Sequence, residues 1–344
     1  MQEERLKQKQ SPNDKSGVLT APLKFSASPH ILAPEDVPKI MRGVVWALLP
    51  AGFASIYFFG FSALSVILIS VAATLFFEYI FLRIFGNKGS IADGSALVTG
   101  ILLAYNLPPG SPWWLVVVGA FIAVLLGKQV YGGLGYNIFN PALVARVFLL
   151  IAWPVQMTTW ILPRPPFPKG AEAVTGATPL GVLKTEFFTK GTIGAAKAIH
   201  LSDLFYGKVG GSLGEVSALA LLIGGGYLLY RKIISWHIPV AYVGTVFLMT
   251  GIFWLVNPDK YINPVFHILA GGLMLGALFM ATDMVTSPVT SKGKLIFGVG
   301  CGIITVVIRL FGGYPEGVSY SILVMNAFTP LIDRYTKPKT FGAK

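Results

Sequence analysis

The run at 172–180, Glu-Ala-Val-Thr-Gly-Ala-Thr-Pro-Leu, holds the residues whose types and spacing favour chemistry most clearly. Thr178 precedes Pro179, the usual order of an N-cap and the first residue of a helix, so we predict that the Thr178 hydroxyl stands at the start of a short helix. A phosphate there would meet free backbone N–H groups and the positive end of the helix dipole. Gly176 and Ala177 leave little side chain in its way. An ordinary N-cap in a surface loop is the alternative.

Several ionisable side chains fall inside or at the ends of apolar segments, where such groups are expensive and often mark an ion path. Glu78 and Arg146 are two of them. Asp283, together with Thr282 and Thr286, would offer hard oxygen ligands to Na⁺. Capping of a helix end or pairing with an opposite charge is the alternative for each of these residues.

The chain that positions these residues is far more apolar than a soluble domain. Its 344 residues are 54% hydrophobic and 12% charged, with a mean hydropathy of +0.67, which is typical of a polytopic membrane protein. The net charge of +12 does not indicate a nucleic-acid partner, because the Lys and Arg residues cluster beside apolar segments, where they orient spans and contact the lipid bilayer. The single cysteine, Cys301, excludes an internal disulfide and cannot supply an iron–sulfur cluster by itself.

Apolar segments that approach the length of a bilayer span alternate with short turns along the chain. We predict an all-α polytopic membrane protein with ten transmembrane helices, five on each side of a large extracytoplasmic loop. The predicted spans are 42–60, 63–85, 94–107, 113–127, 142–153, 215–230, 238–256, 265–282, 294–310 and 318–332. The corresponding division is a disordered cytoplasmic tail (1–24), a cytoplasmic amphipathic segment (25–41), a first transmembrane repeat (42–153), the loop (154–214), a second repeat (215–333) and a cytoplasmic tail (334–344). Ser212 and Glu215 have the spacing of a capping box before the sixth span.

The two halves of the chain resemble each other. Residues 131–148 align without a gap on residues 311–328, and Gly, Gly, Leu, Val and Phe coincide. Because each half has an odd number of spans, the second copy would be upside down relative to the first, giving two five-helix inverted repeats. Chance similarity between glycine-rich helices is the alternative. In such folds the short or Gly/Pro-broken helices approach the pseudo-twofold axis, which indicates the third, fifth, eighth and tenth spans.

Basic residues outside the spans indicate the orientation of the chain. Most of them, Lys128 included, fall on the side of the N-terminus, whereas the short loops of the opposite side carry only Lys260 and Arg309. We therefore expect both termini to be cytoplasmic and the loop at 154–214 to lie outside, in a bacterial or archaeal cytoplasmic (inner) membrane.

The same run that holds Thr178 resembles the flavin-attachment motif of the Rnf and Na⁺-NQR families. In that motif an acidic residue, two variable positions, Ser or Thr, Gly, Ala and Thr precede an FMN that is joined through its phosphate to the last Thr. The resemblance implies that Thr178 carries the phosphoester and that Thr175, Gly176 and Ala177 are its recognition context. Glu172 takes the acidic position, where the family usually has Asp.

The resemblance covers nearly the whole chain from Phe25 onward. Residues 132–143 and 281–283 are similar to segments that RnfD, a membrane component of the Rnf complex, shares with NqrB, and residues 28–30 with 47–51 resemble the entry segment of RnfD. The chain is identified as a member of the NqrB/RnfD family of ion-translocating oxidoreductase membrane subunits. The lack of a longer N-terminal extension favours the RnfD branch.

Membership implies a membrane subunit, inactive alone, of a complex that passes electrons between ferredoxin and NAD⁺ by way of flavins, coupled to Na⁺ or H⁺ translocation. The implied partners are the other Rnf subunits (A, B, C, E and G) and the flavin transferase that attaches the FMN. Resemblance to NqrB also suggests a second, non-covalent flavin such as riboflavin near Asn137 and Asn140, because side-chain amides can satisfy the pyrimidine edge of a flavin as donor and acceptor. Helix capping before Pro141 is the alternative for both residues.

Functions of two other classes are compatible with the repeat. A channel or secondary transporter for a small solute would use an inverted repeat equally well. A structural scaffold would leave Thr178 unmodified. A covalent flavin on Thr178 discriminates the electron carrier from both.

Overall fold

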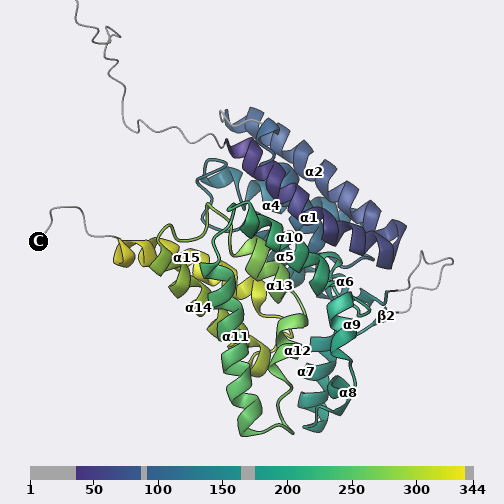
Figure 1. The fold of residues 1–344 in the computed structure, drawn as a ribbon. Coiled ribbons are helices and arrows are strands. Elements are labelled where there is room, and N and C mark those ends of the chain that lie inside the picture. Colours follow the sequence, from purple (N-terminus) through teal and green to yellow (C-terminus); the bar gives the residue numbers. More distant parts are fainter. Residues whose placement is uncertain (1–35, 87–90, 164–174, 338–344) are drawn as a thin grey trace, which may run out of the picture. The chain divides into compact units, whose positions relative to one another are not determined.

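The computed structural model describes residues 36–86, 91–163 and 175–337, which are mostly helical (Figure 1). Several sequence predictions lie outside the described residues: Glu172, the tail 1–24, most of the segment 25–41 and much of the tail 334–344.

The first half of the chain begins with two long helices, α1 (Val37–Phe59) and α2 (Phe61–Phe85), which lie side by side in Figure 1. Gly60 alone joins them, and its φ of 63° lies in the left-handed region that glycine adopts readily. The remaining elements of this half are η2 (Ile91–Asp93), α3 (Ser95–Tyr105), α4 (Trp113–Leu125), η3 (Gln129–Tyr131) and α5 (Pro141–Ala152). Each span predicted in this half is therefore a helix within a few residues of its predicted ends.

The second half contains four continuous helices and one that is broken. The continuous helices are α10 (Ala218–Tyr230), α11 (His237–Val256), α14 (Ser291–Phe311) and α15 (Val318–Thr336). The predicted eighth span is instead α12 (Pro264–Leu269), α13 (Leu273–Leu275) and a π-helical turn, η5 (Gly276–Met280). The break falls at Gly271, where a φ of 69° ends the first piece. The eighth span is one of the four that the sequence indicated as short or Gly/Pro-broken, and it is broken here.

Helices α11 and α14 pack against each other over most of their length. Gly298 and Gly302 lie one turn apart on α14 and face α11. A Cβ added to Gly298 would lie 2.7 Å from the Cβ of Ala241, and one added to Gly302 would lie 2.6 Å from the Cβ of Thr245. Small residues at this spacing let two membrane helices approach backbone to backbone.

Five helical segments of the described part are long and apolar enough to cross a membrane: Val37–Phe59, Phe61–Phe85, Trp113–Tyr131, His237–Val256 and Ser291–Phe311. Helices α3, α5 and α10 are apolar but shorter. The chain is a multi-pass helical membrane protein.

The segment between α5 and α10 folds into short elements. They are α6 (Pro154–Thr158), β1 (Trp160–Ile161), β2 (Thr175–Gly176), α7 (Pro179–Lys190), α8 (Gly194–Lys197), α9 (Leu201–Tyr206) and η4 (Leu213–Glu215). The antiparallel pair β1–β2 departs from the all-α prediction within the described residues. Leu180, Ile193, Leu204 and Phe266 form a small core of their own, which fixes α7, α8 and α9 against α12.

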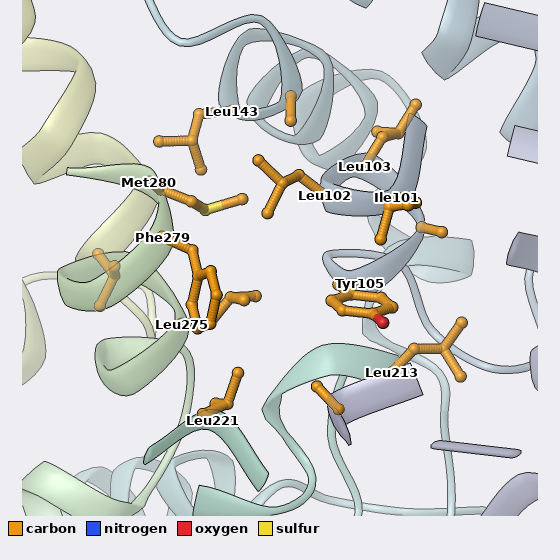
Figure 2. Packing of buried hydrophobic residues seen from close by; sticks show 14 of the residues in the cluster. Ile101, Leu102, Leu103, Tyr105, Leu143, Leu213, Leu221, Leu275, Phe279 and Met280 are labelled. Carbon is orange, nitrogen blue, oxygen red and sulfur yellow. The ribbon is translucent and has the colours of Figure 1, made fainter. Parts of the chain in front are cut away.

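The main core draws on helices of both halves, and within it α3 faces the broken helix. Figure 2 shows Leu102 and Tyr105 of α3 facing Phe279 and Met280 of η5, with Leu143 of α5 beside them. The Tyr105 hydroxyl donates a hydrogen bond to the carbonyl of residue 48 in α1 at 2.7 Å. Apolar packing of this kind holds the short helices between the long ones.

Candidate functional site

Thr178 is the N-cap of α7, as the sequence predicted. Its backbone is extended (φ −66°, ψ 156°), and its Oγ accepts a hydrogen bond from the backbone N–H of Gly181 at 3.0 Å. Pro179 occupies the first helical position, where its missing N–H costs nothing. The prediction that the hydroxyl stands at the start of a helix is confirmed.

Two glycines near Thr178, Gly176 and Gly181, lie close to neighbouring side chains. Thr175 and Gly176 form β2, which pairs with β1 and sets the course of the chain into the cap. A Cβ added to Gly176 would lie 3.0–3.2 Å from side-chain atoms of Leu162. One added to Gly181 would lie 3.1 Å from the Oγ of Thr178. A larger residue at 181 would therefore press on the Thr178 hydroxyl, and one at 176 would press on Leu162.

A cavity of ≈ 190 Å³ adjoins Thr178, and we call it the Thr178 cavity. Its walls come from α5, the β1 strand, α7 and the connection between α14 and α15, and include Arg146, Trp160, Ala177, Thr178, Tyr314 and Glu316. This volume is below the range of about 300–1,000 Å³ that small-molecule sites occupy.

A buried ion cluster forms one wall of this cavity. The Nη1 of Arg146 donates to Oε1 of Glu215 at 2.9 Å and to Oδ1 of Asn106 at 2.6 Å, and its Nη2 pairs with Oε2 of Glu316. Arg146 and Glu215 are each 6% exposed. The pairing alternative for Arg146 is confirmed, and the site gains two carboxylates that the sequence did not assign to it.

The predicted capping box at Ser212 and Glu215 was wrong. Ser212 makes no side-chain capping hydrogen bond, and the carboxylate of Glu215 goes to Arg146 instead. Ser217 caps α10, its Oγ accepting from the N–H of Ala220 at 3.4 Å.

Glu316 has an unusual protonation equilibrium for a carboxyl group. Burial, and then the charge of Glu215, raise the pKa of Glu316 to about 7 from its ordinary value of 4.5, while Arg146 and Arg309 oppose the rise. A proton on Glu316 is therefore exchangeable near neutral pH.

A second cavity, of ≈ 90 Å³, brings together Asn137, Asn140 and Asp283, and we call it the Asn137 cavity. The capping alternative is confirmed for Asn140, whose Oδ1 accepts from the N–H groups of Ala142 and Leu143 at 3.1 and 3.4 Å. Asn137 behaves differently: its Nδ2 donates to the carbonyl of residue 139 at 3.3 Å, but its buried Oδ1 has no partner among the described residues.

The carboxylates near this cavity are engaged by their neighbours. Thr286 donates to Oδ2 of Asp283 at 3.1 Å, whereas the hydroxyl of Thr282 donates to the backbone carbonyl of residue 278. Glu78 pairs with Lys128 at 2.7 Å. Lys128 is only 2% exposed, so its charge belongs to this pair and not to the surface count used for orientation. No group of three or more His, Cys, Asp or Glu residues suited to a metal ion occurs in the described part of the chain.

Comparison with known proteins identifies the chain's relatives. The model of the "NQR2, RnfD, RnfE family" matches residues 24–342. The chain belongs to this family. Family membership, which the motifs indicated, is thereby confirmed.

Three relatives of the chain are named as D subunits. The chain is 48% identical to the D subunit of the proton-translocating ferredoxin:NAD(+) oxidoreductase complex of Clostridium ljungdahlii, over 93% of its length and 96% of that protein's. It is also 48% identical to the D subunit of the Na(+)-translocating ferredoxin:NAD(+) oxidoreductase complex of Acetobacterium woodii, over 93% and 95%. Identity to the D subunit of the ion-translocating oxidoreductase complex of Halorhodospira halophila is 42%, over 92% and 94%.

Proposed function

We propose that the chain is the D subunit of an ion-translocating ferredoxin:NAD⁺ oxidoreductase complex and that it carries FMN as a phosphoester on Thr178. The observation that supports this most directly is the position of Thr178. Its hydroxyl lies at the N-terminus of α7 beside the Thr178 cavity, in a chain whose relatives are named as such D subunits.

The residues around Thr178 fit a flavin phosphate. The first-turn N–H groups of α7 have no partner within the helix, and the N–H of Gly181 now bonds to the hydroxyl that would be esterified. Phosphate oxygens would accept from these donors at the positive end of the helix dipole. Trp160 and Tyr314 supply aromatic walls for a planar ring. The flavin would supply electron transfer, and the chain would hold it and exclude water.

The proposal includes ten spans arranged as two inverted repeats, with both termini cytoplasmic and Thr178 on the outside. Each predicted span coincides with helix, although the eighth is broken. Broken helices at a repeat interface are a feature of inverted-repeat folds. The cluster of Arg146, Glu215 and Glu316 joins one half of the chain to the other, which suits a site near the pseudo-twofold axis.

The Asn137 cavity supports a second, non-covalent flavin such as riboflavin. Of its two asparagines, Asn137 has the free side-chain acceptor, because the Oδ1 of Asn140 caps α5. Asp283, which lines the same cavity, remains our candidate for a Na⁺ ligand. The two relatives at 48% identity are named for different ions, so sequence similarity does not decide between Na⁺ and H⁺.

The partners in this proposal are the other Rnf subunits (A, B, C, E and G) and a flavin transferase. The chain's single cysteine cannot hold an iron–sulfur cluster. Partner subunits would therefore bring the clusters and the nucleotide site.

The test uses the complex purified from its native membrane. We expect the denatured subunit to fluoresce as a flavoprotein on a gel, and the peptide containing Thr178 to gain the mass of FMN less one water. The variant Thr178→Val should lose both signals, while Thr185→Val, which removes a hydroxyl of the same helix and the same cavity, should keep them.

Two results would overturn the assignment. An unmodified Thr178 in the active complex would remove the covalent carrier and favour a scaffold. A colourless subunit that moves a small solute into vesicles would favour a transporter.

A further inference from the structure

The cluster beside Thr178 carries more negative than positive charge. One guanidinium, Arg146, serves both Glu215 and Glu316, and the only other partner described for it is the amide of Asn106. Oε2 of Glu215 is buried without a hydrogen-bond partner among the described residues. Two neighbouring carboxylates that share one directly bonded cation in a buried site tend to retain a proton, because each carboxylate disfavours ionisation of the other.

A glycine beside the cluster accommodates the side chain of Glu215. Gly272 leaves room for its carboxylate, because an added Cβ at that position would clash with Oε1 of Glu215. A narrow crevice lined by Thr178, Glu215, Gly271 and Glu316 continues from the cluster to the cap of α7. Glu215 and Thr178 thus line the same crevice.

Other charged and titratable groups near Glu316 also influence how strongly the pair of carboxylates retains a proton. Arg309 of α14 attracts the Glu316 carboxylate electrostatically. Its guanidinium donates to the backbone carbonyls of residues 267 and 270. The rings of Tyr314 and Tyr320 lie nearby, tilted by 30° with their centroids 5.4 Å apart, and Lys184 of α7 donates to the carbonyls of residues 308 and 309 in α14. Arg309 therefore opposes the rise in the pKa of Glu316 that burial and Glu215 cause.

We propose that Glu316 and Glu215 form a proton-binding site beside Thr178, and that negative charge attached to the Thr178 hydroxyl increases its occupancy. Binding forms an O–H bond on one carboxylate with a proton from water, and no electron moves. The second part rests on the proposed function, because the charge in question is that of the flavin phosphoester.

The proton site is tested by infrared spectroscopy of the purified complex as the pH is varied, with Glu labelled by ¹³C. We expect the band of a protonated glutamic acid to disappear with a midpoint between about pH 6 and pH 8, as the pKa of Glu316 requires. Glu316→Gln should abolish the band, and Glu215→Gln should move its midpoint to lower pH. Asp259→Asn, which alters a fully exposed carboxylate, should change nothing. A wild-type complex without a titrating glutamic-acid band overturns the proton site, whether or not the variants fold.

The linkage is tested by comparing the wild type with Thr178→Val. We expect the midpoint of the glutamic-acid band to be lower in the variant by about one pH unit. A unit charge roughly 10 Å away produces a shift of this size at an effective dielectric constant of about 20. If the wild-type complex carries the flavin and its glutamic-acid band has the same midpoint as that of Thr178→Val, the linkage is overturned and the flavin assignment stays intact. Absence of the flavin overturns the proposed function and the linkage together, while the glutamic-acid band still decides the proton site.

Discussion

Three consecutive glycines on α10 allow the packing of this region to be tested with matched variants. A Cβ added to Gly224 would overlap the carbonyl oxygen of Ala47 in α1 and lie 3.0 Å from the Cζ of Phe279. One added to Gly225 would lie 2.7 Å from the Cδ1 of a leucine side chain, and one added to Gly226 would meet nothing within 4 Å. The methyl group that Gly→Ala adds therefore lies against backbone at 224, against a movable side chain at 225 and in open space at 226.

The expected free energies of unfolding follow from these neighbours. Gly224→Ala forces two helix backbones apart, and such overpacking costs about 1–3 kcal/mol or more. Gly226→Ala adds no clash and removes the conformational freedom of glycine, which stabilises a helix by up to about 1 kcal/mol. Because both variants share this gain in helix propensity, they should differ by the overpacking cost of about 1–3 kcal/mol, with Gly225→Ala between them because a leucine can change rotamer.

The assay is thermal unfolding of the purified protein in detergent, followed by circular dichroism. Gly226→Ala controls for the change in helix propensity, since it has the same chemistry on the same helix. If Gly224→Ala unfolded at the same temperature as Gly226→Ala, the close approach of α10 to α1 would be refuted. A distorted Asn137 cavity is also expected in Gly224→Ala, because Phe279 lines it.

Three further predictions concern charges and packing in the described core. Lys128→Met should destabilise the protein by about 3–5 kcal/mol, since it leaves Glu78 buried without its partner; adding Glu78→Gln should restore most of the loss in the same unfolding assay. Because the folded state raises the pKa of Glu316 from 4.5 to about 7, it binds a proton that the unfolded chain releases, so stability should fall as pH rises from about 4.5 to 7, and Glu316→Gln should flatten that slope in melts across pH. Gly298→Val should lower the melting temperature by separating α14 from α11, whereas Gly244→Val, at a glycine with nothing within 4 Å of the added Cβ, should not show this loss.

The sequence was most informative where structure depends on neighbouring residues. The cap at Thr178 could be predicted because an N-cap and a proline at the first helical position are adjacent in the chain. Long spans could be predicted because hydropathy accumulates over some twenty residues. The eighth span was among those expected to be short or broken, but the position of its break could not be predicted, because the residues from 265 to 282 remain apolar through Gly271 and hydropathy does not record a left-handed φ.

The partners of Arg146 show why the rest of the site could not be predicted. A cation in an apolar span requires a carboxylate, but Glu215 and Glu316 lie 69 and 170 residues further along the chain, and only the tertiary fold brings them to it. Local reasoning placed Glu215 in a capping box with Ser212, an interaction of about 1 kcal/mol. An unpaired buried guanidinium would cost about 3–5 kcal/mol. The long-range pair therefore prevails over the local cap, and a glutamate beside a possible helix start should be assigned to a cap only after every buried cation of the chain has been given a partner.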